Sequence, residues 1–195
     1  MDSYASRTAM LFAADNVWEE SLETMTGLLE RLYSIIRIRQ AGEKVHDSFE
    51  TLTSIHEAMR DEKYTRKEDH ILFKDLAIKL EDVFKHLLQA YAIEYSLVLT
   101  DRYGNRIGLS DATVDYLSMC FVTSVYGRPS PPPYPRVYPA ITLLIRFLRN
   151  SEEHETNKPV DHITGKHSFG NVYTLCSLFI VTIYAYKEIL EKWIG

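Results

Sequence analysis

Apolar residues recur at steps of three and four along most of the chain, which is the pattern of helices that bury one face. The first stripe predicts a long helix that ends near Gly42, because glycine commonly terminates helices. Further stripes predict a shorter helix over residues 46–60 and a long one over residues 67–99. The first stripe consists of Leu22, Met25, Leu29, Leu32 and Ile36.

The second half of the chain alternates turn signals with apolar stripes. Residues 101–107 predict a turn, which could also be the tip of a small β-hairpin. Ser110 or Asp111 is a suitable N-cap for a fourth helix that ends near Gly127. The proline-rich segment 129–135 is incompatible with a helix, and we expect an extended connector there rather than an SH3-type ligand.

Two more helices complete this pattern. Pro139 suits the first turn of a fifth helix, which carries an apolar stripe as far as Leu148. A polar loop follows, and the last helix runs from about residue 171 to residue 193. The sequence therefore predicts an all-α bundle of five to six helices that forms a single domain over residues 1–195.

Composition limits the setting of this bundle. With 46% hydrophobic and 25% charged residues the chain is typical of a globular protein, and its net charge of −5 argues against a broad, unspecific nucleic-acid binder. Residues 172–186 are apolar but short for a membrane span, so we expect a buried helix and no membrane. The first residues lack the features of a secretory signal, and Cys120 and Cys176 lack metal-ligand spacing, which suits a reducing cytoplasm.

The clearest chemical signal follows the fifth helix. Arg149 and Asn150 are adjacent, and His154 comes four intervening residues after Arg149. This pattern resembles the HEPN superfamily, whose hallmark is an arginine, a polar residue and then a histidine, with four to six residues between arginine and histidine. The resemblance concerns the segment from about residue 110 to residue 195. In one toxin subfamily a tyrosine stands two residues after the histidine, where this chain has Thr156.

The resemblance implies a metal-independent endoribonuclease that needs no cofactor. His154 would be the general acid or base for attack of the ribose 2′-OH, since imidazole titrates near neutral pH. Arg149 would bind the scissile phosphate with its planar fork of donors. Asn150 would orient His154 or the phosphate by hydrogen bonding. Lys158 and Lys166, in the loop that follows, could extend the phosphate-binding pocket.

The resemblance also implies a homodimer whose two motifs meet in one cleft. On an ideal helix His154 lies about 140° around the axis from Arg149, so one helix cannot aim both at one atom. RNA is the expected substrate, and a protein partner such as an antitoxin is possible. Defence, toxin activity or RNA processing in the cytoplasm would be the setting.

Other patterns remain open or weaker. Arg149 could instead be a cation at a helix C-terminus paired with Glu153, in which case the chain is a non-catalytic helical interaction module. Arg39 and His46 repeat the Arg-to-His spacing, but the pair spans Ala41 and Gly42, where we expect a helix to end, so we interpret this pair as accidental. No histidine has metal-ligand spacing, so we expect no metal site and interpret four histidines as surface or capping residues: His46, His56, His70 and His86.

Overall fold

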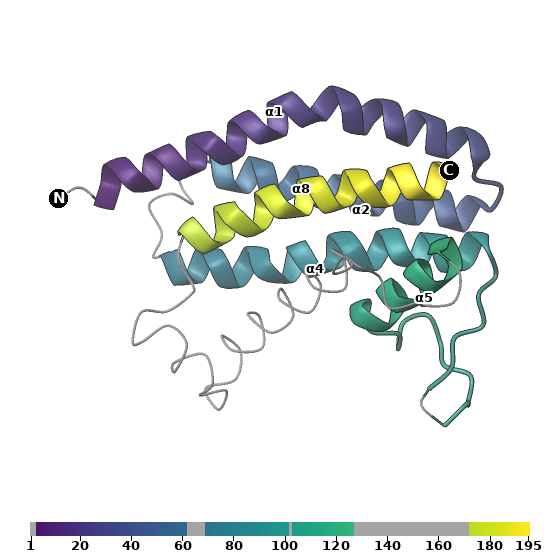
Figure 1. Ribbon diagram of the computed structural model, residues 1–195. Helices are drawn as coiled ribbons and strands as arrows, with labels where there is room; N and C mark the ends of the chain where they lie inside the picture. The colour runs from purple at the N-terminus through teal and green to yellow at the C-terminus, as the bar shows by residue number, and fades with distance from the viewer. Residues whose placement is uncertain (1–2, 62–68, 102, 127–171) are drawn as a thin grey trace.

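Five α-helices make up most of the chain that the computed structural model describes, namely residues 3–61, 69–101, 103–126 and 172–195. Four long helices lie side by side, and a short one packs near the end of the bundle (Figure 1). No β-strand occurs within these described ranges, so the predicted all-α bundle is confirmed. The helices are α1 (Ser3–Ile35), α2 (Arg39–Arg60), α4 (Asp69–Glu94), α5 (Val114–Tyr126) and α8 (Val172–Ile194).

The helices α1, α2 and α4 alternate in direction, whereas α8 runs in the same direction as α4 (Figure 1). α2 runs antiparallel to α1, α4 runs antiparallel to α2, and α8 runs parallel to both α1 and α4 (Figure 1). The pairs with the most extensive packing are α2 with α4 and α1 with α8. The N-terminus of α8 therefore lies at the same end of the bundle as the N-termini of α1 and α4.

The core is built from the stripes that the sequence predicts. In α1, Met25, Leu29 and Leu32 are buried, whereas Leu22 and Ile36, the latter just beyond the end of α1, are only partly buried. In α2 the buried positions recur at steps of four and three, as expected for a helix that packs one face against its neighbours. These α2 positions include Ala41, Val45, Ser48, Leu52, Ile55 and Met59.

Ser48 allows α2 and α4 to pack closely. Its hydroxyl is fully buried and donates a 2.6 Å hydrogen bond to the backbone carbonyl of Val83 on α4. A larger side chain at this position would push the two helices apart. An apolar side chain would remove the hydrogen bond to the Val83 carbonyl.

The link between α1 and α2 differs from the prediction. Gly42 does not end the first helix, because α1 ends at Ile35 and Gly42 lies in the first turn of α2, where its backbone N–H bonds to the carbonyl of Ile38. The link is held from a distance by Glu94, whose carboxylate accepts 3.0 Å hydrogen bonds from the backbone N–H groups of Arg37 and Ile38. A carboxylate on α4 thus caps the start of α2.

Two further boundaries were placed wrongly from the sequence. The helix expected over residues 67–99 is α4, which ends at Glu94, and Ser96 adopts a positive φ of 49° just beyond it. The fourth helix begins at Val114 rather than after Ser110 or Asp111, because Asp111 is part of a turn closed by its N–H and the carbonyl of Gly108.

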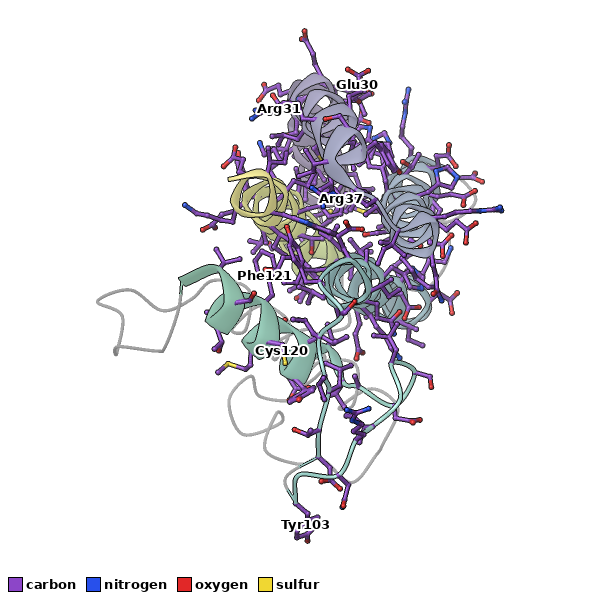
Figure 2. All side chains as sticks on the ribbon, turned by 90° about the vertical axis from the view of Figure 1, so that its right-hand side faces the viewer. Glu30, Arg31, Arg37, Tyr103, Cys120 and Phe121 are labelled. Carbon is purple, nitrogen blue, oxygen red and sulfur yellow. The ribbon has the colours of Figure 1, made fainter. Side chains whose placement is uncertain are left out.

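The turn expected within residues 101–107 is confirmed, and in the described residues the possible hairpin is reduced to one isolated bridge without strands. Thr100 and Arg106 form an antiparallel bridge, and Gly104 takes the positive φ of 84° that this tight turn requires. Figure 2 shows Tyr103 at the tip of this loop, projecting away from the helices.

An aromatic group fixes α5 to the bundle. The ring of Tyr91 on α4 makes edge contacts with Phe121 of α5 and Trp193 of α8, with ring centroids 4.7 and 5.2 Å apart. The Tyr91 hydroxyl and the Ser124 hydroxyl are 2.8 Å apart, which adds a polar contact beside the apolar one. Three helices therefore share one cluster at this end of the bundle.

The last helix matches its prediction within one residue at each end. It is long and apolar enough to cross a membrane by length and composition, a test that buried helices of globular proteins also pass. Here 56% of its most apolar window is buried inside the bundle. Its inner face includes Cys176, Phe179, Ile183, Tyr186 and Leu190.

Candidate functional site

The residues of the Arg149-to-His154 motif lie outside the described part of the chain. The same is true of the predicted fifth helix, of the proline-rich connector and of Lys158 and Lys166. Whether Arg149, Asn150 and His154 converge therefore stays a prediction.

The accidental Arg39 and His46 pair lies within the described helices. Arg39 is the first residue of α2, its side chain is 93% exposed, and its Nε bonds to the Glu43 carboxylate at 2.8 Å. His46 is exposed further along the same helix. The Arg39 side chain is therefore paired within its own helix, with Glu43.

A different histidine, His56, is buried and lies beside a carboxylate. His56 on α2 is only 5% exposed, so our interpretation of it as a surface or capping residue was wrong. Its imidazole stacks on the indole of Trp18 with centroids 4.7 Å apart, and it also lies parallel to the ring of Phe179, 6.2 Å away. Aromatic rings from α1 and α8 thus hold the imidazole plane in one orientation.

That orientation directs Nε2 of His56 at a carboxylate. Nε2 lies 2.6 Å from Oδ1 of Asp15 on α1, a hydrogen bond in which a protonated Nε2 donates. Glu19 stands one helical turn after Asp15 on the same face. The ligand-type atoms of Asp15, Glu19 and His56 all lie within 4.8 Å of one another. We call these three residues the Asp15 cluster.

Arg60 lies at the edge of the Asp15 cluster. Its Nε is 3.7 Å from Asp15 Oδ1 and its Nη1 is 3.8 Å from Glu19 Oε1, distances that are ionic but too long for good hydrogen bonds. The Arg60 side chain is 63% exposed, so solvent screens these pairs strongly. The guanidinium balances one of the two negative charges without being fixed there.

A cavity of about 190 Å³ opens beside the cluster. One part of its wall is polar and consists of Asp15, His56 and Arg60, while the rest is mainly apolar and includes Leu11, Met59 and Phe179. Phe12, also on the wall, is 64% exposed, which is unusual for a phenylalanine. A concave apolar pocket with a few convergent polar groups is the usual form of a ligand site.

Sequence reasoning missed this site because nothing local marks it. Asp15 and His56 are 41 residues apart and lie on different helices. The one available signal is the spacing of Asp15, Trp18 and Glu19, which puts two carboxylates beside an aromatic ring on one side of α1. That spacing does not reveal which side chain of α2 will face them.

A second titratable group lies between α2 and α4, away from the cavity. Burial lowers the pKa of His86 below its ordinary value, and the nearby Lys44 ammonium lowers it further. The carboxylates of Asp82 and Asp47 and a hydrogen bond with the Asp47 backbone oppose this effect. The His86 imidazole is therefore harder to protonate in the folded protein than in the unfolded chain.

Comparisons with protein-family models, with curated proteins and with solved structures give no match to this chain.

Proposed function

We propose that the protein is a metal-independent endoribonuclease of the HEPN type. The observation that carries the proposal is the sequence Arg149-Asn150 followed by His154, in the segment that precedes the last helix of an all-α bundle. The architecture agrees with a helical domain of this kind. The chain enters α8 at Val172, eighteen residues after His154, and the inner face of α8 lies in the core.

The proposed chemistry needs only side chains and the substrate's own hydroxyl. His154 removes the proton from the ribose 2′-OH, the oxygen attacks the adjacent phosphorus, and the P–O bond to the 5′ oxygen of the next nucleotide breaks. A protonated imidazole returns a proton to that leaving oxygen. Arg149 offsets the charge that develops on the phosphate oxygens, and Asn150 holds the reacting groups in place.

The proposed active form is a homodimer, and α8 provides a surface for it. Tyr173, Val181 and Tyr184 are 39%, 40% and 55% exposed and lie along one side of α8, opposite its buried face. With Ser177 and the partly buried Ile180 they form a stripe at helical spacing, which we call the α8 stripe. A two-fold axis through this stripe would bury its apolar area.

The test is incubation of the purified protein with labelled RNA in EDTA. We expect cleavage that leaves 2′,3′-cyclic phosphate ends or their hydrolysis products, and no cleavage of DNA of the same sequence, because DNA lacks the attacking hydroxyl. His154→Ala, purified in the same way, is the matched control for a contaminating ribonuclease. Cleavage that occurs only with Mg²⁺ or Mn²⁺ would exclude this mechanism.

A non-catalytic interaction module is the second candidate, and the exposed α8 stripe favours it. In that case RNA stays intact under all these conditions, while substitutions in the stripe still change the assembly of the protein.

A further inference from the structure

We propose that Asp15, Glu19 and His56 bind a divalent transition-metal ion of the Zn²⁺ class, with one coordination position open to the adjacent cavity. The donor set is one imidazole nitrogen and two carboxylate oxygens, drawn from two helices. This site is separate from the Arg149-to-His154 motif, whose proposed chemistry requires no metal.

The geometry is close to what a bound ion requires. Neighbouring ligand atoms of a tetrahedral zinc lie about 3.3 Å apart, since zinc–nitrogen and zinc–oxygen distances are about 2.0–2.2 Å. His56 Nε2 and Asp15 Oδ1, at 2.6 Å, need to separate only slightly. Glu19 must move furthest, because the three atoms are spread over as much as 4.8 Å, and its side chain is 56% exposed and able to turn.

His56 supplies the fixed ligand. Its side chain is 94% buried, and the rings of Trp18 and Phe179 on its two neighbouring helices set its plane. The His56 side chain is already ordered in the folded protein, so ion binding costs little further conformational entropy at this ligand. Coordination at Nε2 uses the neutral tautomer that carries its proton on Nδ1, so the ring changes tautomer when the ion replaces the Nε2 proton beside Asp15.

Arg60 is the group that the ion displaces. It balances the carboxylates from 3.7 and 3.8 Å, without a short hydrogen bond to either, and extends into solvent. A dication would take over this charge balance, and the guanidinium would turn outward. Arg60 therefore competes with the ion, and its removal should tighten binding.

The cavity gives the site its open side. Its volume of about 190 Å³ is enough for roughly six water molecules, and both Asp15 and His56 form part of its wall. Three protein ligands and one position left for water or another small ligand is the arrangement of zinc sites that act on substrates, whereas structural zinc sites are closed by four protein ligands.

The mixed donor set selects the kind of metal. Mg²⁺ and Ca²⁺ prefer oxygen ligands alone, and imidazole favours first-row transition metals. Two carboxylates and one imidazole therefore suit Zn²⁺, Co²⁺ or Fe²⁺, and we expect Mg²⁺ to bind far more weakly.

The experiment is titration of the full-length, chelator-treated protein with Zn²⁺ by calorimetry and with Co²⁺ by visible absorption. We expect one saturable site, cobalt bands of a four- or five-coordinate ion, and no comparable binding of Mg²⁺. Glu19→Gln and Asp15→Asn should each weaken binding by more than about tenfold. Arg60→Gln should tighten binding about threefold to tenfold, because a nearby positive charge is removed.

Two controls keep the result specific. Glu30→Gln changes an exposed carboxylate about three helical turns from Glu19 on α1 and should leave the affinity as in the wild type. Glu19 and Arg60 are more than half exposed, so their variants should keep the wild-type helical signal even if a variant of buried His56 fails to fold. No saturable binding of Zn²⁺ and Co²⁺, or binding that the Asp15, Glu19 and Arg60 variants leave unchanged, would overturn the proposal. None of these measurements uses RNA, so the outcome is independent of the ribonuclease test.

Discussion

Oε2 of Glu94, at the last position of α4, accepts a 3.0 Å hydrogen bond from the backbone N–H of Ile38, which stands immediately before α2. Its other oxygen accepts a bond from the N–H of Arg37. No side chain of the link itself caps α2, so Glu94 supplies the N-terminal acceptor.

We expect Glu94→Ala to lower the free energy of unfolding by about 1–2 kcal/mol, because two backbone donors lose a charged acceptor. Urea unfolding followed by far-ultraviolet circular dichroism measures this loss. Glu30→Ala, on the exposed face of α1, is the matched control and should change stability by less than about 0.5 kcal/mol. Equal effects of the two substitutions would show that the cap contributes nothing.

If the ribonuclease proposal holds, Arg149→Ala and His154→Ala should each abolish RNA cleavage. Both residues lie off the apolar stripe of the predicted fifth helix, so the thermal transition should stay close to wild type. His46→Ala should leave cleavage unchanged, since His46 is exposed and Arg39 is paired with Glu43. Loss of activity in His46→Ala with retention in His154→Ala would reverse the assignment.

The dimer proposal makes a separate prediction about α8. Val181→Asp and Tyr184→Asp place charges on the α8 stripe, so they should shift the protein from dimer to monomer in sedimentation velocity at micromolar concentration. Both side chains are at least 40% exposed, and the fold should tolerate the changes. Mixing inactive Arg149→Ala and His154→Ala chains should restore part of the activity if the site is composite. A wild-type monomer with full activity would contradict the arrangement.

The pKa of His86 gives a prediction about pH. Burial lowers this pKa in the folded protein below that of the unfolded chain, which is about 6.5. As pH falls below about 6.5, the unfolded chain takes up the proton more readily, so the free energy of unfolding decreases and then levels off below the folded pKa. His86→Gln should therefore lose less stability than wild type between pH 7.5 and pH 5, measured by urea midpoints. His46→Gln, at an exposed position, should behave as wild type, and an identical slope in all three proteins would refute the assignment.

The two cysteines should differ in reactivity. Burial raises the pKa of the half-buried Cys120 thiol, so we expect a thiol-specific disulfide reagent to label it slowly at pH 7.5. Cys176 is fully buried in α8 and should react only when the protein unfolds. Cys120→Ser should remove the native-state labelling. Rapid labelling of two thiols in the folded protein would contradict this placement.

Local periodicity in the sequence was sufficient for the helices and their buried faces. The stripe from Met25 to Leu32 in α1 and the bounds of α8 follow from apolar spacing alone, since an amphipathic segment buries one face whatever its partner. The turn at Gly104 was also visible, because turn chemistry is local. The Arg149-to-His154 motif is likewise a property of the sequence.

Helix ends and the Asp15 cluster were decided by tertiary structure. Gly42 seemed a good terminator, but Glu94, more than fifty residues away, holds the link before it and lets α2 begin at Arg39. His56 has no distinctive neighbours in sequence, and only the packing of α1 and α8 around α2 buries it beside Asp15. Helical periodicity tells which face of a helix turns inward. Which side chains of another helix meet that face depends on how the helices align, and contacts far apart in the chain set that alignment.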